Sequence, residues 1–439
     1  MLNTESNDSQ IILELERLGK LDKNFKHQKK LIDLLSHKSQ DIRILSLKNL
    51  AKIQDLKYLN LFQNIALDKK YSLVRREAVS AIGRLKTTKS KFFLLTLLKD
   101  KDPNIVLQSL RALDRLKIPK EIKKDLTKIS NHKNEIIKKY VNEILSQENK
   151  DLKEIKKDNS FLRNIIVNAD VMKVLNVLPD EVIDLSFTSP PYYNARDYSI
   201  YKSYKEYLEF LATVFKELFR ATKNGRFFIL NTSPVITPRI SRSFSSIRHP
   251  IPFDIHGYLI DMGWVFIDDI VWVKPEPSVR NRNGGFFQHR KPLGYKPNNV
   301  TEYLMVYRKG NNQLIDKNMK DYDKETIKKS LVKKEYESSN LWKIAPNSHK
   351  LHSATFPMEL CDRVVDFYSY VGDLLFDPFS GSGTFAKSAM NKDRNFFSTE
   401  VKKEYVDYFY NEINQKNLFE NKDYKRFNLS EFKKFMKKS

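Results

Sequence analysis

Cysteine is nearly absent from this sequence: Cys361 is the only one among 439 residues. A single thiol excludes an internal disulfide framework and any metal site built from several cysteines. The eight histidines are scattered, and His349 and His352 lack partner ligands, so we expect no metal site. Cys361 lies within a helical apolar pattern, which predicts a buried core thiol rather than a nucleophile.

Long apolar runs are also missing, and acidic residues are outnumbered. No stretch approaches the roughly 18 consecutive apolar residues of a membrane span, and the polar start "MLNTESNDSQ" lacks the order of a signal peptide. We therefore expect a soluble, cytoplasmic protein. Lys and Arg number 78 against 54 Asp and Glu, giving a net charge of +24. This excess favours nucleic acid as the partner, although a lysine-rich proteome bias would give the same composition.

A helical repeat occupies residues 28–147, and the chain is long enough for two or three domains. Its units are two helices each, spaced 32, 31 and 31 residues apart, and their second helices start near Ile42, Val74, Ile105 and Ile136. The position four residues further on is mostly small, which allows close helix approach. The pattern resembles HEAT-like repeats, which implies an α-solenoid over residues 1–150.

The solenoid has two expected roles that the sequence does not separate. Residues 1–150 hold 32 Lys and Arg against 18 Asp and Glu, a net +14, so a DNA-backbone surface is one reading and a protein-docking scaffold is the other. The charged segment "QENKDLKEIKKDNS" follows, and we place the domain boundary in it, with the second domain covering residues 161–439.

From residue 161 onward, β-rich runs alternate with helical patterns, which predicts a doubly wound α/β sheet. The expected strands are "NIIVN", "VIDLSF", "RFFILN", "VFIDDIVWV", "TEYLMVY", "DLLFD" and "NFFSTE". The expected helices are "VMKVLNVL", "YKSYKEYLEFLATVFKELFRAT", "PFDIHGYLIDM", "PMELCDRVVDFYS", "GTFAKSAM" and "KKEYVDYFYNEI".

The stretch "LLFDPFSGSGTFAKSAM" combines a strand, a glycine-rich turn and a helix. The strand ends at Asp377, the turn holds Gly381 and Gly383, and Glu400 ends the next strand 17 residues after Gly383. An acid about 20 residues after such a turn binds ribose hydroxyls in doubly wound folds. Because the third glycine of the dinucleotide fingerprint and a Walker lysine are missing, we expect an adenosine ligand without a pyrophosphate.

The stretch "VIDLSFTSPPY" ends a strand with two prolines. Proline fixes φ and removes an N–H donor, so the backbone carbonyls stay free to accept. If Ser189 and the carbonyl of Pro190 both accept from one exocyclic amine, the nitrogen lone pair leaves conjugation with its ring and becomes nucleophilic. Tyr192 then offers a stacking face for a flat base. The alternative is a strand that simply stops at a surface turn.

Together these segments resemble the DNA amino-methyltransferases, with Thr188 to Tyr192, including Pro191, matching the catalytic Ser-Pro-Pro-Tyr motif. Phe379 to Gly383 match the cofactor motif Phe-x-Gly-x-Gly, and the catalytic motif comes first, as in the β class. The resemblance implies a Rossmann-like methyltransferase sheet, S-adenosylmethionine as cofactor, and methyl transfer to cytosine N4 or adenine N6 of double-stranded DNA. Ser at position 189 favours cytosine N4 within the family.

The resemblance extends over about residues 164–415 and assigns further residues. The residues it implies for the cofactor are Asp170, Thr188, Phe356, Pro357, Asp377, Pro378, Phe379, Gly381, Gly383 and Glu400. The strands "DIVWVKP" and "EYLMVYRKG" resemble those that flank the family's recognition region. A cognate restriction endonuclease is the implied partner within a restriction-modification system, and a non-catalytic DNA-binding scaffold is the alternative from another class.

Two basic segments between the motifs, at about residues 232–252 and 275–350, are the candidate DNA-recognition regions. Arg, Asn, Gln and aromatic side chains suit both phosphate contacts and base-edge contacts. The residues expected to contact DNA are Arg239, Arg242, Arg248, Arg280, Arg282, Arg290 and Lys291. An enzyme that modifies an exocyclic amine must also flip the base out of the duplex.

Overall fold

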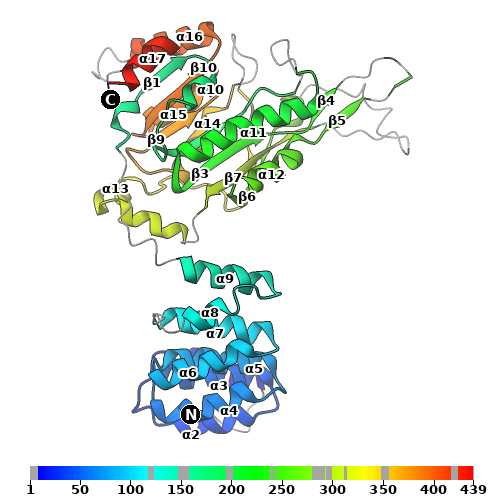
Figure 1. Cartoon of the computed structure of the whole chain (residues 1–439), viewed down its shortest axis with the longest axis vertical. Coiled ribbons are helices and arrows are strands. Elements are labelled where there is room, and N and C mark those ends of the chain that lie inside the picture. Colours follow the sequence, from blue (N-terminus) through cyan, green and yellow to red (C-terminus); the bar gives the residue numbers. More distant parts are fainter. Residues whose placement is uncertain are drawn as a thin grey trace. The chain divides into compact units, whose positions relative to one another are not determined.

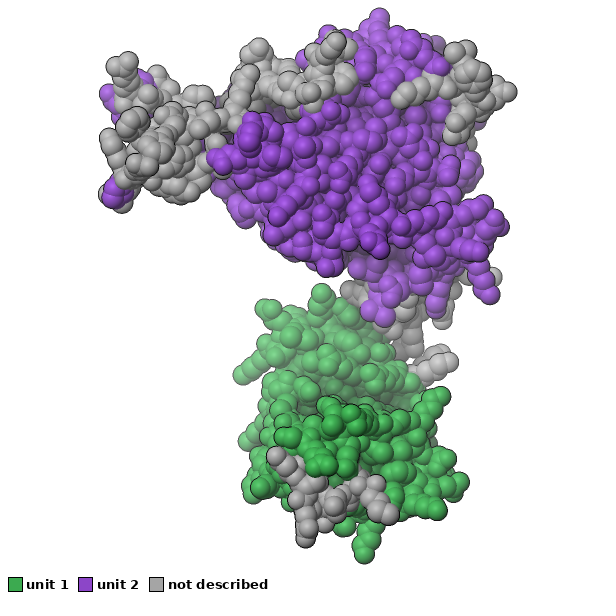
Figure 2. Space-filling model, turned by 180° about the vertical axis from the view of Figure 1, so that it is seen from behind, with its two compact units in different colours: residues 1–155 green, residues 156–439 purple. Residues whose placement is uncertain are grey.

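A computed structural model describes residues 8–116, 123–146, 158–193, 201–237, 241, 243–244, 246–278, 292, 299–310, 314–347, 355–416 and 424–438. The chain divides into two compact units, Met1–Ile155 and Lys156–Ser439, which Figure 2 colours separately. Each unit has its own hydrophobic core. Among the described residues, no helix combines the length and apolar character that a membrane span requires.

The first unit consists of helices that pair along the chain (Figure 1). They are α1 (Asp8–Arg17), α2 (Gln28–Asp33), α3 (Gln40–Ile53), α4 (Leu59–Leu67), α5 (Ser72–Arg84), α6 (Thr88–Thr96), α7 (Pro103–Arg115), α8 (Lys123–Thr127) and α9 (Glu135–Ser146). The second helices of the predicted pairs are α3, α5, α7 and α9. The predicted helical solenoid is therefore confirmed.

Small residues let these second helices approach each other closely. Ser46, Ala78 and Ser109 are fully buried. A Cβ at Gly83 of α5 would lie 2.7 Å from the Cβ of Ala112 in α7, so the contact between these helices depends on glycine. Arg75 is also buried and donates to the carbonyl of Ala66 at 2.9 Å, so its guanidinium helps to hold α5 against α4.

The second unit is built around one nine-stranded sheet of order β11-β1-β10-β9-β2-β3-β7-β6-β8. The strands from β11 to β3 are parallel, and β7 runs antiparallel to both β3 and β6. Their bounds are β1 (Ile165–Asn168), β2 (Ile183–Thr188), β3 (Thr222–Thr232), β6 (Trp264–Val273), β7 (Thr301–Lys309), β8 (Leu341–Lys343), β9 (Leu374–Asp377), β10 (Asn395–Glu400) and β11 (Lys425–Asn428). A separate hairpin pairs β4 (Val235–Thr237) with β5 (Ile247–His249).

Helices cover both faces of this sheet (Figure 1). One face packs against α10 (Val171–Leu175), α11 (Tyr204–Ala221), α12 (Ile251–Asp261) and α17 (Leu429–Met436). The other packs against α14 (Met358–Tyr368), α15 (Thr384–Asn391) and α16 (Lys403–Lys416). The short helix α13 (Lys324–Lys329) completes the unit. Successive side chains of β3 alternate between these cores, as the period of a strand requires, so the doubly wound fold is confirmed.

Candidate active site

The candidate site lies along the carboxyl edge of the parallel strands. Five neighbouring strands, β1, β10, β9, β2 and β3, end there, and open α/β sheets bind ligands at this edge. Their ends carry Asp170, Glu400, the turn from Asp377 to Gly383, the segment from Thr188 to Tyr192, and Asn231. The sheet thus brings the predicted catalytic and cofactor segments to one edge.

The glycine-rich turn between β9 and α15 has a backbone shape that only glycine accepts easily. Gly381 and Gly383 have φ of 50° and 75°, and Gly383 is the N-cap of α15. A Cβ at Gly383 would lie 2.2 Å from the ring of Phe409. The turn is also held from outside, because the N–H of Ser380 donates to the carbonyl of Thr399 at 3.0 Å.

Glu400 lies at the end of β10 and faces this turn. One carboxylate oxygen accepts from the N–H of Gly381 at 2.9 Å and the other from the N–H of Lys402 at 2.8 Å. A carboxylate has about four acceptor positions, so both oxygens can accept further donors. Burial raises the pKa of Glu400. Asp170 follows β1, the strand that pairs with β10. It caps α10 by accepting from the N–H of Lys173 at 3.2 Å.

Asp377 joins the two predicted motifs. Its carboxylate is 3% exposed and accepts from the hydroxyl of Thr188 at 2.7 Å and from the N–H of Phe379 at 3.0 Å. Burial raises its pKa to about 7, and the nearby charge of Glu400 acts in the same direction. Both contacts are made within the protein, so Asp377 holds the end of β2 against the glycine-rich turn.

The segment after Thr188 presents its polar groups close to the end of β3. Ser189 and Tyr192 are half-buried, whereas Pro190 is buried. The Oγ of Ser189 lies 3.3 Å from the Nδ2 of Asn231, and the hydroxyl of Tyr192 donates to Glu302 at 3.0 Å. Burial and the charge of Glu302 raise the pKa of Tyr192 well above its usual value, so the phenol stays neutral.

Three residues of this site were not among the predicted ones: Asn231, Lys274 and Glu302. They come from the end of β3, the end of β6 and the start of β7. Lys274 forms an ion pair with Glu302, and Asn231 donates to the same carboxylate at 2.6 Å. The available sequence signal was a polar residue at the boundary of an apolar strand, as in "RFFILN" and "TEYLMVY".

Aromatic and proline side chains lie at the end of β2, before α14 and in the glycine-rich turn. Phe356 stacks on Phe187 of β2 with ring centroids 4.5 Å apart, and Pro357 is the N-cap of α14. Pro378 is buried and its carbonyl accepts from Thr399 at 2.6 Å. Phe379 packs within 6.3 Å of the ring of Phe210. These aromatic and proline side chains contribute no charge to this part of the edge.

Cys361 is fully buried in α14, as the helical pattern predicts. Burial, together with the charge of Asp377, raises the pKa of its thiol well above the usual value. A thiol held in its protonated form is a weak nucleophile. Within the described residues, no group of three or more His, Cys, Asp or Glu side chains is arranged to hold a metal ion.

Of the seven residues expected to contact DNA, the described part of the chain includes Arg248. It lies on β5 and is exposed, and the next residue, His249, packs edge-to-face on the ring of Tyr193 at 4.9 Å. His249 pairs with Val235 at the base of the β4–β5 hairpin, so this base lies beside Tyr193, the residue after the Ser-Pro-Pro-Tyr segment. The other six, Arg239, Arg242, Arg280, Arg282, Arg290 and Lys291, lie outside the described residues.

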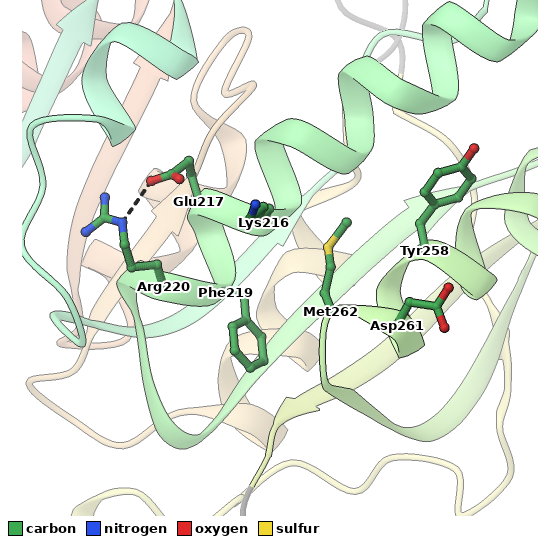
Figure 3. A pocket seen from close by; sticks show the side chains of 7 residues that line it. All are labelled: Lys216, Glu217, Phe219, Arg220, Tyr258, Asp261 and Met262. Atoms are coloured by element: carbon green, nitrogen blue, oxygen red, sulfur yellow. Dashed lines mark hydrogen bonds and ion pairs between the residues drawn. The ribbon is translucent and has the colours of Figure 1, made fainter.

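A pocket of about 490 Å³ lies elsewhere, between the last turns of α11 and α12 (Figure 3). Its lining residues are Lys216, Glu217, Phe219, Arg220, Tyr258, Asp261 and Met262. The chain passes from the end of α11 directly into the start of β3, so this pocket belongs to the opposite edge of the sheet from Asn231. An internal ion pair, Glu217 with Arg220 at 2.8 Å, neutralises part of its charge.

Comparison with known protein families finds two matches. A model described as DNA methylase, of the N6/N4 type, matches residues 183–411, which is more than half of the chain. A HEAT-repeat model matches residues 28–114. The HEAT-repeat match therefore lies within the first unit, and the DNA methylase match lies within the second.

Individual relatives match the second unit. The Type II beta methyltransferase M.BslI of Bacillus sp. (strain NEB-606) is 29% identical over 256 residues, a match that covers 57% of this chain and 27% of that protein. The orphan methyltransferase M.BamHII of Bacillus amyloliquefaciens is 30% identical over 257 residues, covering 52% of this chain and 87% of that protein. The chain thus spans about a quarter of the first relative and most of the second.

A solved structure, the PvuII DNA methyltransferase (cytosine-N4-specific), aligns with a TM-score of 0.43 and 18% identity. The alignment covers 63% of this chain and 92% of that one.

Proposed function

Because this chain belongs to the DNA methylase family, we propose that it is a site-specific DNA methyltransferase that transfers a methyl group from S-adenosylmethionine to cytosine N4. The observation that carries the proposal is the hydrogen bond between Thr188 and Asp377. It fixes the Ser-Pro-Pro-Tyr segment beside the glycine-rich turn, so a base amine and a methyl donor would meet at one edge of the sheet.

The residues at this edge fit the cofactor. Glu400 retains acceptor capacity for two ribose hydroxyls, and the Oγ of Ser380 is buried with no hydrogen-bond partner among the described residues. A side chain at Gly383 would close the turn. Asp170, Phe356 and Pro357 would lie toward the adenine and methionine ends. When bound, S-adenosylmethionine supplies a methyl group already activated by a sulfonium.

The chain's own contribution is placement and hydrogen bonding. Ser189 and the carbonyl of Pro190 would each accept a hydrogen from the exocyclic amine, which directs the nitrogen lone pair out of the ring's π system. Tyr192 would stack on the flipped base. Holding two reactants in the right geometry accounts for a large part of the rate of such transfers.

Cytosine N4 rather than adenine N6 is proposed because the motif begins with Ser189. Transfer to adenine N6 is the alternative, and it would use the same acceptors and the same stacking face. Double-stranded DNA is the proposed substrate, with Arg248 and the six other basic residues of the two recognition segments contacting it. A cognate restriction endonuclease is the proposed biological partner.

The test is methyl transfer from S-adenosylmethionine to DNA from a host that lacks the enzyme, with product nucleosides resolved by mass spectrometry. N4-methylcytosine is the expected product. N6-methyladenine would keep the mechanism and overturn the assignment of the base. If the protein binds cofactor and DNA but forms neither product, a non-catalytic DNA-binding scaffold is the remaining interpretation.

Ser189→Ala tests the role of the motif in the same assay. The change removes one of the two proposed acceptors, so the transfer rate should fall by about tenfold or more, while calorimetry shows unchanged cofactor affinity. Tyr192→Phe or Tyr192→Trp should retain more activity than Tyr192→Ala, because any aromatic face can stack on a base. A wild-type rate for Ser189→Ala would contradict the proposed role.

A further inference from the structure

A half-buried carboxylate, Glu302, lies next to Tyr192 of the Ser-Pro-Pro-Tyr segment. Glu302 is the second residue of β7, and its side chain is 14% exposed. One of its oxygens pairs with the ammonium of Lys274, which is itself 19% exposed. The other accepts from Nδ2 of Asn231 at 2.6 Å and from the hydroxyl of Tyr192 at 3.0 Å. Donors from three separate segments therefore converge on one acidic side chain.

The chemistry of Glu302 determines how its neighbours are oriented. An ionised carboxylate can only accept hydrogen bonds. The phenol of Tyr192 must therefore direct its hydrogen toward Glu302, and the amide group of Asn231 nearest the carboxylate must be the NH2. Lys274 supplies the opposite charge that a carboxylate needs when it leaves water. Both orientations thus follow from the charge of Glu302.

The orientation of the Asn231 amide also determines which of its atoms faces the Ser189 hydroxyl. Its Nδ2 lies 3.3 Å from the Oγ of Ser189 and 3.4 Å from the hydroxyl of Tyr192. One amide hydrogen points to Glu302, so the second is available to the Ser189 oxygen. A serine oxygen has two lone pairs, and the one not used by Asn231 is left for an incoming amine.

We propose that Glu302 is a positioning residue for methyl transfer: it orients the Tyr192 ring through the phenol and the Ser189 hydroxyl through Asn231, with Lys274 as its counter-ion. The inference rests on the proposed function, since it concerns the same two motif residues. It assigns to three residues outside the motif the task of holding the motif ready for the base.

The first test is Glu302→Gln in the full-length chain, with Glu181→Gln as the matched control. Glu181 also accepts from a lysine of β7 and an asparagine, Lys309 at 3.5 Å and Asn224 at 2.7 Å, but it precedes β2 at the opposite edge. Glu302→Gln should lower single-turnover methyl transfer by about tenfold or more, with cofactor affinity unchanged. Glu181→Gln should keep the wild-type rate.

The second test is a double-mutant cycle, which a merely structural role would not satisfy. If Glu302 acts through the phenol, then Glu302→Gln combined with Tyr192→Phe should be no slower than Glu302→Gln alone. Multiplied effects, or an unchanged rate for Glu302→Gln, would overturn the inference. So would equal losses of rate and of cofactor binding, because they would mean that the change only loosens the fold.

Asn231→Ala decides the matter if Glu302→Gln fails to fold. The proposal expects Asn231→Ala to slow transfer and to add nothing when Ser189→Ala is already present. A wild-type rate for Asn231→Ala would overturn it. Wild-type protein that methylates no DNA would refute the proposed function, whereas normal methylation by these variants would refute the positioning role alone.

Discussion

Asp377 is a carboxyl group that the fold keeps away from water. Its pKa is raised from 3.8 to about 7, so the folded protein binds a proton that the unfolded chain releases above about pH 4. The stability of the second unit should therefore fall as pH rises from about 4 to about 7, by at most about 1.4 kcal/mol per pH unit from this group.

Asp377→Asn isolates this contribution. The Asn carbonyl can still accept from Thr188 and Phe379, and it does not titrate. Thermal unfolding followed across pH 4 to 8 should show a flatter pH dependence for the variant than for the wild type. Burial and the charge of Asp184 also raise the pKa of Asp373, at the other end of β9, and this group contributes in the same direction in both proteins. Parallel curves for the two proteins would contradict the assignment to Asp377.

Glu400 gives a second prediction at the scale of one residue. If its free acceptor positions hold ribose hydroxyls, Glu400→Ala should weaken S-adenosylmethionine binding by about tenfold or more. Glu400→Gln keeps an acceptor for one of the two backbone N–H donors and should lose less. Calorimetry measures both affinities, and circular dichroism checks that the fold persists. Wild-type affinity in the Ala variant would remove Glu400 from the cofactor site.

At the scale of elements, the start of α15 depends on one glycine. Gly383→Ala would place a methyl group against the Phe409 ring and force a residue with a Cβ to a φ of 75°. We expect a loss of about 1–3 kcal/mol in the unfolding free energy of this unit and weaker cofactor binding. Gly257→Ala is the control, because Gly257 lies within α12 and a Cβ there meets nothing within 4 Å. A comparable loss in both variants would contradict the packing argument.

The short apolar runs were enough to predict the central strands, and the edge strands β8 and β11 were not predicted. β8 and β11 carry Lys343 and Lys425 and have no continuous apolar run, because an edge strand needs one neighbour and tolerates charge. The same limit applies to the site. Thr188, Asp377 and Gly383 are contiguous with recognisable motifs, whereas Glu302, Asn231 and Lys274 meet only through the antiparallel pairing of β7 with β3 and β6. Pairing of that kind has no local signature.

At the scale of the whole molecule, the chain combines a HEAT-repeat solenoid with a Rossmann-like methylase unit. Deleting residues 1–150 should leave the methylase unit folded, because solenoid repeats contact mainly their neighbours and the cores are separate. Cofactor affinity should not change, and calorimetric unfolding of the remainder should keep its transition. Aggregation or loss of that transition would mean that the two parts share a core.

The same deletion also tests whether the positive charge of the solenoid contributes to DNA binding. If the net +14 of residues 1–150 contacts DNA, the deletion should reduce the slope of log affinity against log salt concentration. An unchanged slope with normal methylation would leave protein docking as the role of the repeats.

The ion pair between Lys274 and Glu302 also closes a loop. The chain leaves the site at Lys274 and returns at Glu302, and the N–H of Lys274 donates to the carbonyl of Val300 at 2.8 Å, so both ends of this excursion are fixed together. Loop-closure entropy grows slowly, by about 0.6 kcal/mol for each doubling of length. A change in the length of the sequence between these two residues should therefore cost little closure free energy and leave the ion pair in place. If that sequence contacts DNA as proposed, a change in target preference would leave the proposed methyl-transfer site intact.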